Sequence, residues 1–434
     1  MKYFCVGIKG SGMSTLACIL KDLGNEVAGY DDNKNHAYTE EGLEKRGIKI
    51  YYDQTHEIDP EMTVTYSKAF KEDHPEMIKL RESGVNFVEY NELLGQLTGM
   101  FDTTCVSGTH GKTTTSLMLS RVLNNSVGTN FFVGDGSGYA NKENKNFVIE
   151  SCEYMKHFLA YHPTVTIITN IELEHVECYD GIEDIRNTFQ TLANRSKYIV
   201  CDGDDENIRL LNLEPETIFY GFNDNNDIIA KNLEMGPNGS TYDVYYKGEF
   251  LDTFHIPLTG KHMVLNSLAV IGVSLYYSVS KEVIKESLST FESPKRRFKE
   301  TKVKDNIVVD DYAHHPTELM ATIESARTKY PDKTIVAIFK PNTYSRTEAL
   351  EDDFVKALNQ ADVAYVTPIE CNREKQSDYP NVSSDAIVAK LTNGSLLQSD
   401  DVETLLQYDN ACLLFMSCAN IYTMKDKYIE EKNK

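Results

Sequence analysis

Short apolar runs alternate with helical patterns from one end of the chain to the other. Runs of about four to eight apolar and β-branched residues predict strands, and apolar positions three or four apart predict helices. The predicted strands are Tyr3–Ile8, Glu26–Tyr30, Phe147–Ile149, Val165–Thr169, Tyr198–Cys201, Ile307–Val309, Ile335–Phe339, Val363–Thr367 and Cys412–Met416. The predicted helices include Ser14–Leu23, Thr113–Leu123 and Pro316–Tyr330. This alternation is typical of α/β proteins, whose mostly parallel sheets carry helices on both faces.

One stretch departs from this alternation. Residues 228–256 read as short alternating strands, Thr241–Tyr246 and Phe250–His255, and predict an antiparallel hairpin inserted in the middle of the chain.

The chain length and two polar breaks predict three domains. At about 150 residues per domain, 434 residues suggest three. The breaks lie near Leu97–Phe101 and Glu292–Pro294. The predicted domains are residues 1–99, 100–293 and 294–434. The first and last are expected to be Rossmann-like and the central one to carry a mostly parallel sheet.

The charge balance limits the classes of ligand. The chain has 44 Lys and Arg against 66 Asp and Glu, a net charge of −22. A broad nucleic-acid footprint needs a basic face, so no nucleic-acid partner is expected. The electrostatic field of this negative charge also repels small anions, so an anionic substrate would need a local positive pocket.

Cysteine and targeting patterns predict a cytoplasmic protein. The nine cysteines form no C-x-x-C pair, which disfavours a cysteine zinc site, and several lie in apolar runs typical of buried thiols. The first residues contain no long apolar stretch. No run approaches the ~18 apolar residues of a membrane helix, so no membrane insertion is expected.

The strongest motif is a shortened P-loop between an apolar run and a helical pattern. Its residues are Gly108, Thr109, His110, Gly111, Lys112 and Thr113. Two residues separate the glycines, where the consensus has four. Backbone N–H groups of such a loop hold phosphates, the lysine reaches the β- and γ-phosphates, and the hydroxyl binds Mg²⁺. The alternative is a glycine turn that caps a helix.

A second glycine-rich turn, Gly7–Gly12, follows the first predicted strand. Asp31 and Asp32 end the second strand about 20 residues later, where a carboxylate can bind a ribose or a base edge. The pattern favours a nucleotide-diphosphate site; a purely structural turn is the alternative.

Further polar residues follow other predicted strands. Glu150 ends one predicted strand and His175 lies in the loop after the next. In a parallel sheet both loops lie on the P-loop side, so the two residues could complete a Mg²⁺ shell begun by Thr113. An ordinary strand-end charge and a structural histidine are the alternatives. In the last domain, 310–316 and 340–347 are polar loops after strands, and Lys295–Phe298 is a basic cluster that could equally be solvated.

Together these segments resemble the Mur ligase family over essentially the whole chain. GTHGKTTT at 108–115 is similar to the family's shortened P-loop, and EHVECY at 174–179 resembles its metal-histidine segment. GKHMVLNSLA at 260–269 resembles the adenine-side element. KRRF at 295–298 and DDYAHHPTE at 310–318 resemble the branch that adds the first amino acid of the peptidoglycan stem.

The resemblance implies a role for each matching residue. The implied ATP-binding residues are Gly108, Thr109, His110, Gly111, Lys112, Thr113, Thr114, His262, Asn266, Arg297 and Asp311. The implied UDP-sugar residues are Gly10, Ser11, Gly12 and Asp31, and the implied Mg²⁺ ligands are Thr113, Glu150 and His175. Lys112, His175, His314 and Arg346 are implied as catalytic, with Arg346 anchoring the carboxylate of the incoming amino acid.

The implied activity uses ATP and two Mg²⁺ ions. It joins L-alanine to the lactyl carboxylate of UDP-N-acetylmuramate through an acyl phosphate and releases ADP and phosphate. The three domains would bind the UDP-sugar, ATP and the amino acid in chain order. Relatives that add later residues often carry a modified lysine fifteen positions after the metal histidine, where this chain has Gln190. Only small-molecule partners are implied, with the chain acting as a monomer or weak homodimer.

Three departures from the family pattern keep alternatives open. Lys9 replaces a usual glycine, Met263 a usual asparagine and Asn342 a usual histidine. The alternatives are a related ligase that joins a preformed peptide to the same sugar, a P-loop kinase, and an inactive UDP-sugar-binding protein.

Overall fold

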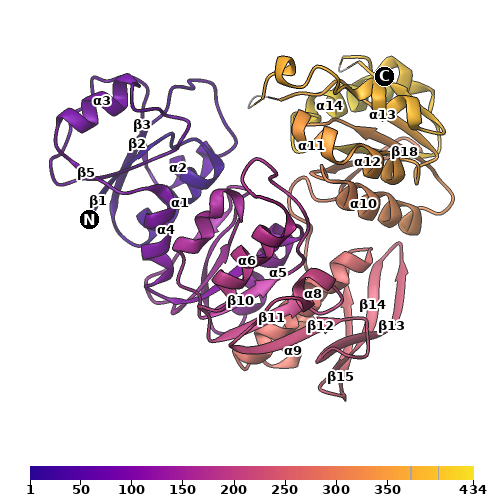
Figure 1. The fold of residues 1–434 in the computed structure, drawn as a ribbon, viewed down its shortest axis with the longest axis horizontal. Helices are drawn as coiled ribbons and strands as arrows, with labels where there is room; N and C mark the ends of the chain where they lie inside the picture. The colour runs from indigo at the N-terminus through magenta and orange to yellow at the C-terminus, as the bar shows by residue number, and fades with distance from the viewer. Residues whose placement is uncertain (372–373, 399) are drawn as a thin grey trace. The chain divides into compact units, whose positions relative to one another are not determined.

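The computed structural model describes residues 1–371, 374–398 and 400–434 and contains three sheets (Figure 1). The chain forms two compact units, each described here by itself. The first comprises residues 1–172, 182–229 and 266–287, and the second comprises 173–181, 230–265 and 288–434.

The N-terminal sheet has five strands in the order β3-β2-β1-β4-β5, and all of its pairings are parallel. The strands are β1 (Lys2–Val6), β2 (Glu26–Tyr30), β3 (Lys49–Tyr51), β4 (Thr63–Tyr66) and β5 (Asn86–Phe87). The helices are α1 (Ser11–Asp22), α2 (Glu40–Lys45), α3 (Pro75–Glu82) and α4 (Tyr90–Thr98). Strand order reverses at β1, so the loop after β1 lies at a topological switch point, where open α/β sheets bind ligands.

The first strand is shorter than its apolar pattern predicts. It ends at Val6 because Gly7 takes a φ of +78°, a left-handed conformation that favours glycine. A Cβ at Gly7 would also lie 2.9 Å from Cε2 of Phe70. The chain therefore turns here, and helix α1 begins at Ser11, three residues before the predicted start.

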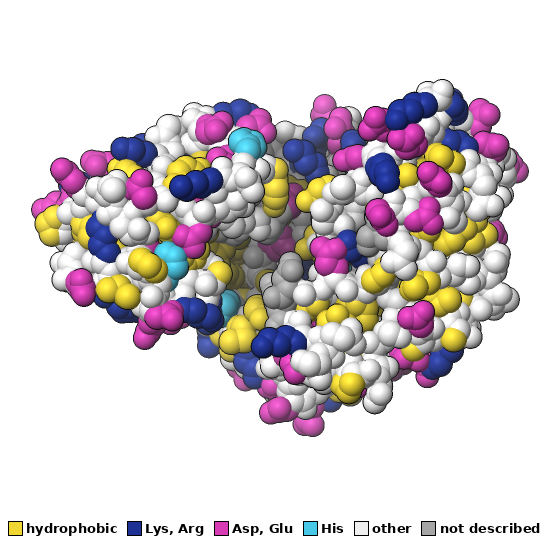
Figure 2. Space-filling view, turned by 90° about the horizontal axis from the view of Figure 1, so that it is seen from above, with side chains coloured by type: hydrophobic (Ala, Val, Ile, Leu, Met, Phe, Trp, Pro, Cys, Tyr) yellow, Lys and Arg dark blue, Asp and Glu magenta, His cyan; other side chains and the backbone are white. Residues whose placement is uncertain are grey.

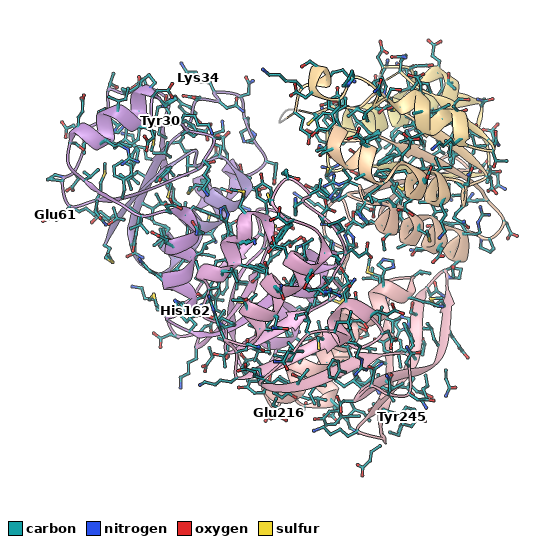
Figure 3. The ribbon with its side chains drawn as sticks, in the orientation of Figure 1. Tyr30, Lys34, Glu61, His162, Glu216 and Tyr245 are labelled. Atoms are coloured by element: carbon teal, nitrogen blue, oxygen red, sulfur yellow. The ribbon has the colours of Figure 1, made fainter. Side chains whose placement is uncertain are left out.

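The central sheet has ten strands in the order β15-β14-β13-β12-β11-β10-β6-β9-β7-β8. They are β6 (Asp102–Ser107), β7 (Thr129–Phe132), β8 (Gly138–Tyr139), β9 (Asn146–Glu150), β10 (Val165–Ile168), β11 (Tyr198–Asp202), β12 (Glu216–Gly221), β13 (Ile228–Gly236), β14 (Gly239–Tyr246) and β15 (Glu249–Ile256). The pairings that join β7, β9, β6, β10, β11, β12 and β13 are parallel. The predicted hairpin is confirmed, since β14 and β15 pair antiparallel. Figure 3 labels Glu216 at the start of β12 and Tyr245 on β14.

The helices that accompany this sheet lie between its strands and after the hairpin. They are α5 (Lys112–Asn124), η1 (Tyr154–Ala160), α6 (Ile182–Ala193), α7 (Glu206–Arg209), α8 (Lys261–Tyr276) and α9 (Lys281–Ser289).

The C-terminal sheet has six strands in the order β16-β17-β21-β18-β19-β20. They are β16 (Lys299–Val303), β17 (Asn306–Asp311), β18 (Thr334–Phe339), β19 (Val363–Val366), β20 (Gly394–Leu396) and β21 (Ala411–Met416). Among the described strands of this sheet, β16 and β17 pair antiparallel and the other pairings are parallel. The helices are α10 (Pro316–Lys329), α11 (Tyr344–Ala349), α12 (Glu351–Leu358), η2 (Gln376–Asp378), α13 (Ser384–Lys390), η3 (Glu403–Gln407) and α14 (Tyr422–Asn433).

Successive residues of β18 belong to two separate cores. Ile335, Ala337 and Phe339 pack in a cluster with residues of α10, α12 and α13, whereas Val336 and Ile338 pack with residues of α14 and η3. Side chains alternate across a strand, so an unbroken apolar run means that both faces are covered. The apolar runs of the sequence therefore predict this doubly covered sheet, and the α/β class with three mostly parallel sheets is confirmed.

Each predicted domain segment holds the strands of one sheet. The boundaries at 99/100 and 293/294 themselves stay predictions. No disulfide joins the cysteines, all of which lie in the described part of the chain.

The core of the C-terminal sheet should be sensitive to the loss of Phe339, whose ring is fully buried and stacks on Phe354 with centroids 5.0 Å apart. We expect Phe339→Ala to cost about 3–5 kcal/mol of stability, because a large cavity remains. Phe250→Ala is the control, since Phe250 is 56% exposed. Calorimetric melting of the two variants measures the difference; equal melting temperatures would contradict this packing.

Candidate active site

The shortened P-loop joins β6 to α5, and two of its glycines have no room for a side chain. Gly108 has a φ of +129° and Gly111 a φ of +81°. A Cβ at Gly108 would lie 2.0 Å from Oγ1 of Thr169, and one at Gly111 would lie 2.6 Å from Oδ1 of Asn266. The loop backbone is thus pressed against the end of β10 and the second turn of α8. Both contacts hold the loop in one conformation.

Polar groups after β10 hold the same loop by its backbone. The N–H of His110 donates to Oδ1 of Asn170 at 2.8 Å, and the N–H of Thr109 donates to the Asn170 carbonyl at 3.0 Å. The N–H of Glu172 donates to Oγ1 of Thr109 at 2.9 Å. This bracing preorganises the loop, so little ordering is needed when an anion binds.

Lys112 lies folded over the loop that it follows. Its Nζ donates to the carbonyls of Gly108 and Thr109, at 2.5 and 2.8 Å, and to Oε2 of Glu153 at 3.0 Å. Burial lowers the pKa of Lys112, but the neighbouring Glu153 carboxylate outweighs it, so the pKa stays above its usual range. The amine is therefore a permanent cation beside the loop amides. Thr114 is buried in the first turn of α5.

Thr113 and Glu150, two of the predicted Mg²⁺ ligands, are brought together. Oγ1 of Thr113 donates to Oε1 of Glu150 at 2.9 Å, and Oε2 of Glu150 accepts from the N–H of Gly134 at 2.7 Å. A hydroxyl and a carboxylate are hard oxygen donors, which suit Mg²⁺. The residues present therefore fit the predicted ion.

His175, the third predicted ligand, belongs to the second unit. Its φ is +54°, and its Nδ1 lies 3.7 Å from Oε1 of Glu177. A hydrogen bond from His175 lowers the pKa of the Glu177 carboxyl. The participation of His175 in the metal shell stays a prediction.

The first glycine turn joins β1 to α1. Gly10 is the N-cap of α1 and makes no side-chain cap. A Cβ at Gly12 would lie 2.4 Å from the hydroxyl of Tyr90. Helix α1 has 12 residues, and its N-terminal amides include those of Ser11 and Gly12. The N-terminus of a helix favours a bound anion, because its amides are unpaired and the helix dipole is positive there.

Asp31 is buried and bonded to backbone rather than left open. Its Oδ2 accepts from the N–H of Lys9 at 2.9 Å and its Oδ1 accepts from the N–H of Asn33 at 3.0 Å. The carboxylate therefore holds the backbone of the turn after β1 and of the loop after β2, a role that the sequence does not reveal.

The second unit contains a cavity of about 420 Å³ that includes two predicted ATP-binding residues, His262 and Asp311. Its lining also includes Met263, Thr322, Ser325 and Lys329. Oγ of Ser325 is buried and has no hydrogen-bond partner among the described residues. The cavity therefore offers an unused polar group in a lining that mixes polar side chains with apolar ones such as Leu258, Met263 and Phe291.

Burial favours the neutral form of both His262 and Asp311. It lowers the pKa of His262 to about 4. It raises the pKa of Asp311 to about 6, although Arg297 opposes the shift. Asp311 also accepts from the N–H groups of Phe298 and Ala313, at 2.6 and 2.7 Å. Arg297, for its part, lies 4.8 Å from the ring centre of Tyr312.

Arg346 is anchored by a carboxylate that the motif analysis overlooked. Nε of Arg346 donates to Oε1 of Glu174 at 3.0 Å, and Nη2 bonds to the same oxygen. Burial alone would raise the pKa of Glu174. Arg346 and the histidines 175, 314 and 315 outweigh burial and lower this pKa to about 2. The pair is buried and fully charged. Glu174 precedes His175 directly, which is the one sequence signal that could have identified it.

His314 lies in the loop after β17 with one ring nitrogen engaged. Its Nδ1 lies 3.0 Å from the carbonyl of Tyr312 and 3.1 Å from Oε2 of Glu318. Both neighbours are acceptors, so we assign the proton to Nδ1, which leaves Nε2 as the basic nitrogen.

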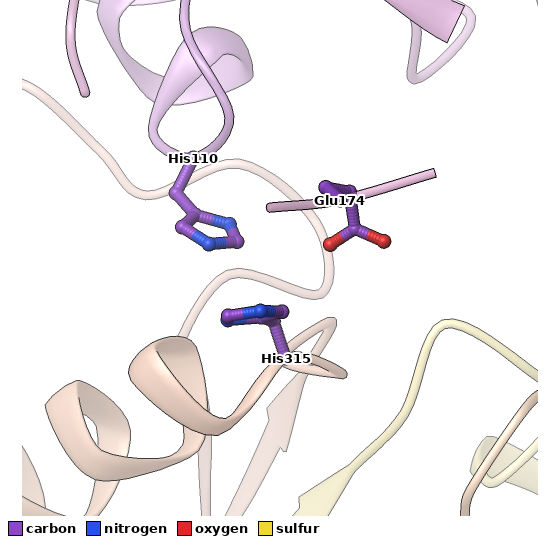
Figure 4. Close-up of side chains that lie close together, drawn as sticks. All are labelled: His110, Glu174 and His315. Atoms are coloured by element: carbon purple, nitrogen blue, oxygen red, sulfur yellow. The ribbon is translucent and has the colours of Figure 1, made fainter. Parts of the chain in front are cut away.

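The next residue, His315, caps helix α10 in a capping box with Glu318. Figure 4 labels Glu174 and His315, which belong to the second unit, and His110, which belongs to the first.

Three family models match consecutive parts of the chain. Residues 2–102 match the Mur ligase family catalytic domain, residues 106–274 match the Mur ligase middle domain, and residues 296–415 match the Mur ligase glutamate ligase domain.

Solved structures share the fold over most of the chain. UDP-N-acetylmuramate–alanine ligase from Thermotoga maritima is 24% identical, covers 99% of each chain and superposes with a TM-score of 0.82. A murein peptide ligase from Psychrobacter arcticus is 21% identical, covers 100% of this chain and 99% of its own, and has a TM-score of 0.71. The MurF ligase from Thermotoga maritima, solved with ADP, is 19% identical, covers 87% and 96%, and has a TM-score of 0.68.

The chain belongs to the Mur ligase family. It is an ATP-dependent ligase that forms amide bonds in peptidoglycan synthesis. Within the described residues, none of the helices has both the length and the apolar content needed to cross a bilayer.

The Glu174–Arg346 pair should make stability depend on pH. The pKa of Glu174 is about 2, below its ordinary 4.5, so its ionised form contributes stability that is present above about pH 4.5 and is lost as the pH falls toward 2. We expect Glu174→Gln to lower the melting temperature above pH 4.5 and to approach the unmodified protein below it. The control is the exposed Glu249→Gln, and both are measured by calorimetry with a chelator present. A difference independent of pH would contradict the ionised pair.

Proposed function

We propose that this chain joins L-alanine to the lactyl carboxylate of UDP-N-acetylmuramate, with ATP converted to ADP and phosphate. The observation that carries the choice of an amino-acid substrate is Arg346. It is a guanidinium in helix α11, which follows β18, with a side chain that is 15% exposed, and Glu174 accepts from its Nε and Nη2 through one oxygen. The remaining donors can bind a small carboxylate in a bidentate geometry. L-alanine is favoured by the segment 310–318 and by Gln190 in place of the modified lysine.

The energetic problem of the reaction is the leaving group. A carboxylate does not react with an amine, because the amine would have to expel oxide. The lactyl carboxylate oxygen therefore attacks the γ-phosphorus of ATP, the bond to the ADP oxygen breaks, and an acyl phosphate forms. The amine then attacks the acyl carbon, and phosphate leaves from the tetrahedral intermediate.

The P-loop residues would act on the phosphates. The amides of 108–114 and Nζ of Lys112 are positioned to hold them in line for transfer, and Lys112 would exchange its carbonyl partners for phosphate oxygens. Thr113 and Glu150 would hold Mg²⁺, with His175 proposed for a second ion. Bound Mg²⁺ neutralises the charge on the phosphate oxygens.

The attacking amine must be neutral. Nε2 of His314 is the group we propose to accept its proton, because the hydrogen on Nδ1 is fixed by two acceptors. Its charge after proton uptake would be stabilised by Glu318.

We propose the remaining contacts from the predicted residues. The amides at Gly10, Ser11 and Gly12 would hold the UDP diphosphate, with Asp31 shaping the loop. His262 and Asn266 would lie near adenine, Asp311 near the ribose and Arg297 near the phosphates. A cytoplasmic location and a monomer or weak homodimer belong to the same proposal.

The decisive experiment is ADP release with UDP-N-acetylmuramate and a panel of nucleophiles. We expect turnover with L-alanine and a loss of ~100-fold or more in Lys112→Ala, since a donor to the transferred phosphoryl is removed. Lys68→Ala, an exposed lysine of the same unit, is the control. Turnover with a preformed tripeptide but not with alanine would favour the murein peptide ligase activity. A stable phosphorylated product would indicate a kinase, and no turnover an inactive binding protein.

The role of Arg346 is tested by Arg346→Lys, which keeps the charge but loses the planar fork. We expect the KM for alanine to rise by ~30-fold or more, with the KM for ATP nearly unchanged, because a charge-assisted bidentate contact is lost. Arg327→Lys, whose arginine forms an exposed pair with Asp362, serves as the matched control. Equal changes in both KM values would contradict the anchor.

A further inference from the structure

Lys9 lies in the first glycine turn, yet its side chain is withdrawn from solvent. The side chain is 4% exposed, and its Nζ donates to the carbonyls of Asn33 and Asn35, at 2.5 and 2.6 Å. The third partner is Oε1 of Glu40, at 2.6 Å, itself only 9% exposed. An ammonium has three donors, and all three are used within the protein.

The segment that receives these bonds is residues 31–40, which runs from the end of β2 to the start of α2. Besides the Nζ contacts, the N–H of Lys9 donates to Asp31 at 2.9 Å and the Lys9 carbonyl accepts from Oγ1 of Thr39 at 2.7 Å. Glu40 also accepts from the N–H of Ala37 at 2.8 Å. The segment therefore closes around one side chain. Figure 3 labels Tyr30 at its entry and Lys34 within it.

The same segment rests on the loop that holds Glu150. At Gly136, a Cβ would lie 3.3 Å from Cε2 of Tyr38 and 3.6 Å from Cγ2 of Thr39. The N–H of Gly134, two residues earlier, donates to Glu150. The position of residues 31–40 is thus set by Lys9 and by the loop around Gly136.

A lysine in a phosphate-binding turn has two possible uses. It can contact the phosphate directly, or it can hold the walls of the site. Direct contact would require Lys9, whose side chain is only 4% exposed, to leave Glu40, and the loss of one partner from a buried pair is strongly unfavourable. Lys112, at 12% exposed, is proposed to exchange only its carbonyl partners and to keep Glu153. Burial alone would lower the pKa of Lys9, and Glu40 raises it, so the amine stays charged. We call its three contacts, to Asn33, Asn35 and Glu40, the clamp.

We infer that Lys9 is a positioning residue that preorganises residues 31–40 as a wall of the sugar-nucleotide site. The inference rests on the proposed function, because it assigns that turn to the UDP-sugar acid. A wall that is ordered before binding spares the ligand the entropy cost of ordering it.

The test compares Lys9→Met, Glu40→Gln and the double variant. The matched control is Lys45→Met, which removes a lysine of α2 from an exposed pair with Glu41. We expect the KM for UDP-N-acetylmuramate to rise about tenfold in both single variants. The KM values for ATP and alanine should stay within about twofold, and the double variant should be no worse than either single one.

If Lys9 instead contacted the phosphate directly, the KM for the sugar nucleotide would change in the opposite direction in Glu40→Gln. Glu40→Gln would then release Lys9 toward the diphosphate and lower the KM for the sugar nucleotide. That outcome, or additive effects in the double variant, would overturn the clamp.

Hydrogen exchange keeps this inference separate from the proposed function. Without any substrate, amides of residues 31–40 should exchange faster in Lys9→Met than in the unmodified chain, and those of Lys45→Met should not. Unchanged exchange in Lys9→Met overturns the clamp even if the enzyme is active. If the unmodified chain does not turn over UDP-N-acetylmuramate, the proposed function fails and the exchange result alone decides whether the clamp exists.

Discussion

The close approach of the P-loop backbone to its neighbours is the constraint on which the candidate site depends. Gly108 faces Thr169 and Gly111 faces Asn266 at distances that leave no space for a Cβ. These contacts join the loop after β6 to the end of β10 and to α8, so three segments far apart in the sequence define one backbone surface. The helix amides, Lys112, Thr113 and Glu150 take their positions from it.

Buried cations paired with carboxylates recur at each place where we propose that an anion binds. Lys9 pairs with Glu40, Lys112 with Glu153 and Arg346 with Glu174. The net charge of −22 is therefore more than a surface property, although Figure 2 shows acidic and basic side chains interspersed over the visible face. The carboxylates hold the three cations in place, and they keep Lys9 and Lys112 charged, since burial alone would favour the neutral amine. This arrangement reconciles an acidic chain with anionic ligands.

The sequence predicted what depends on local order and left out what depends on distant partners. The apolar run Glu26–Tyr30 coincides with β2, and the hairpin and the P-loop were recognisable because their patterns are contiguous. Short edge strands such as β5, with two residues, carry too little pattern to detect. No sequence pattern pairs Glu153 with Lys112 or Glu174 with Arg346, because both pairings arise from the folded topology; the position of Glu174 directly before His175 was the one local signal. Asp31 was predicted to bind ribose, and the backbone hydrogen bonds that it accepts became visible only in three dimensions.

The resting contacts of Lys112 have a consequence for selectivity. The ammonium already has two carbonyls and a carboxylate as partners, so an incoming anion gains only the difference between its own contacts and those that it displaces. A single phosphate, which can replace few of them, gains little. A triphosphate chain that also engages the loop amides and the Thr113–Glu150 pair recovers much more. On these contacts the loop should discriminate by the length of the phosphate chain, because only a long chain offers enough partners to replace those that Lys112 gives up.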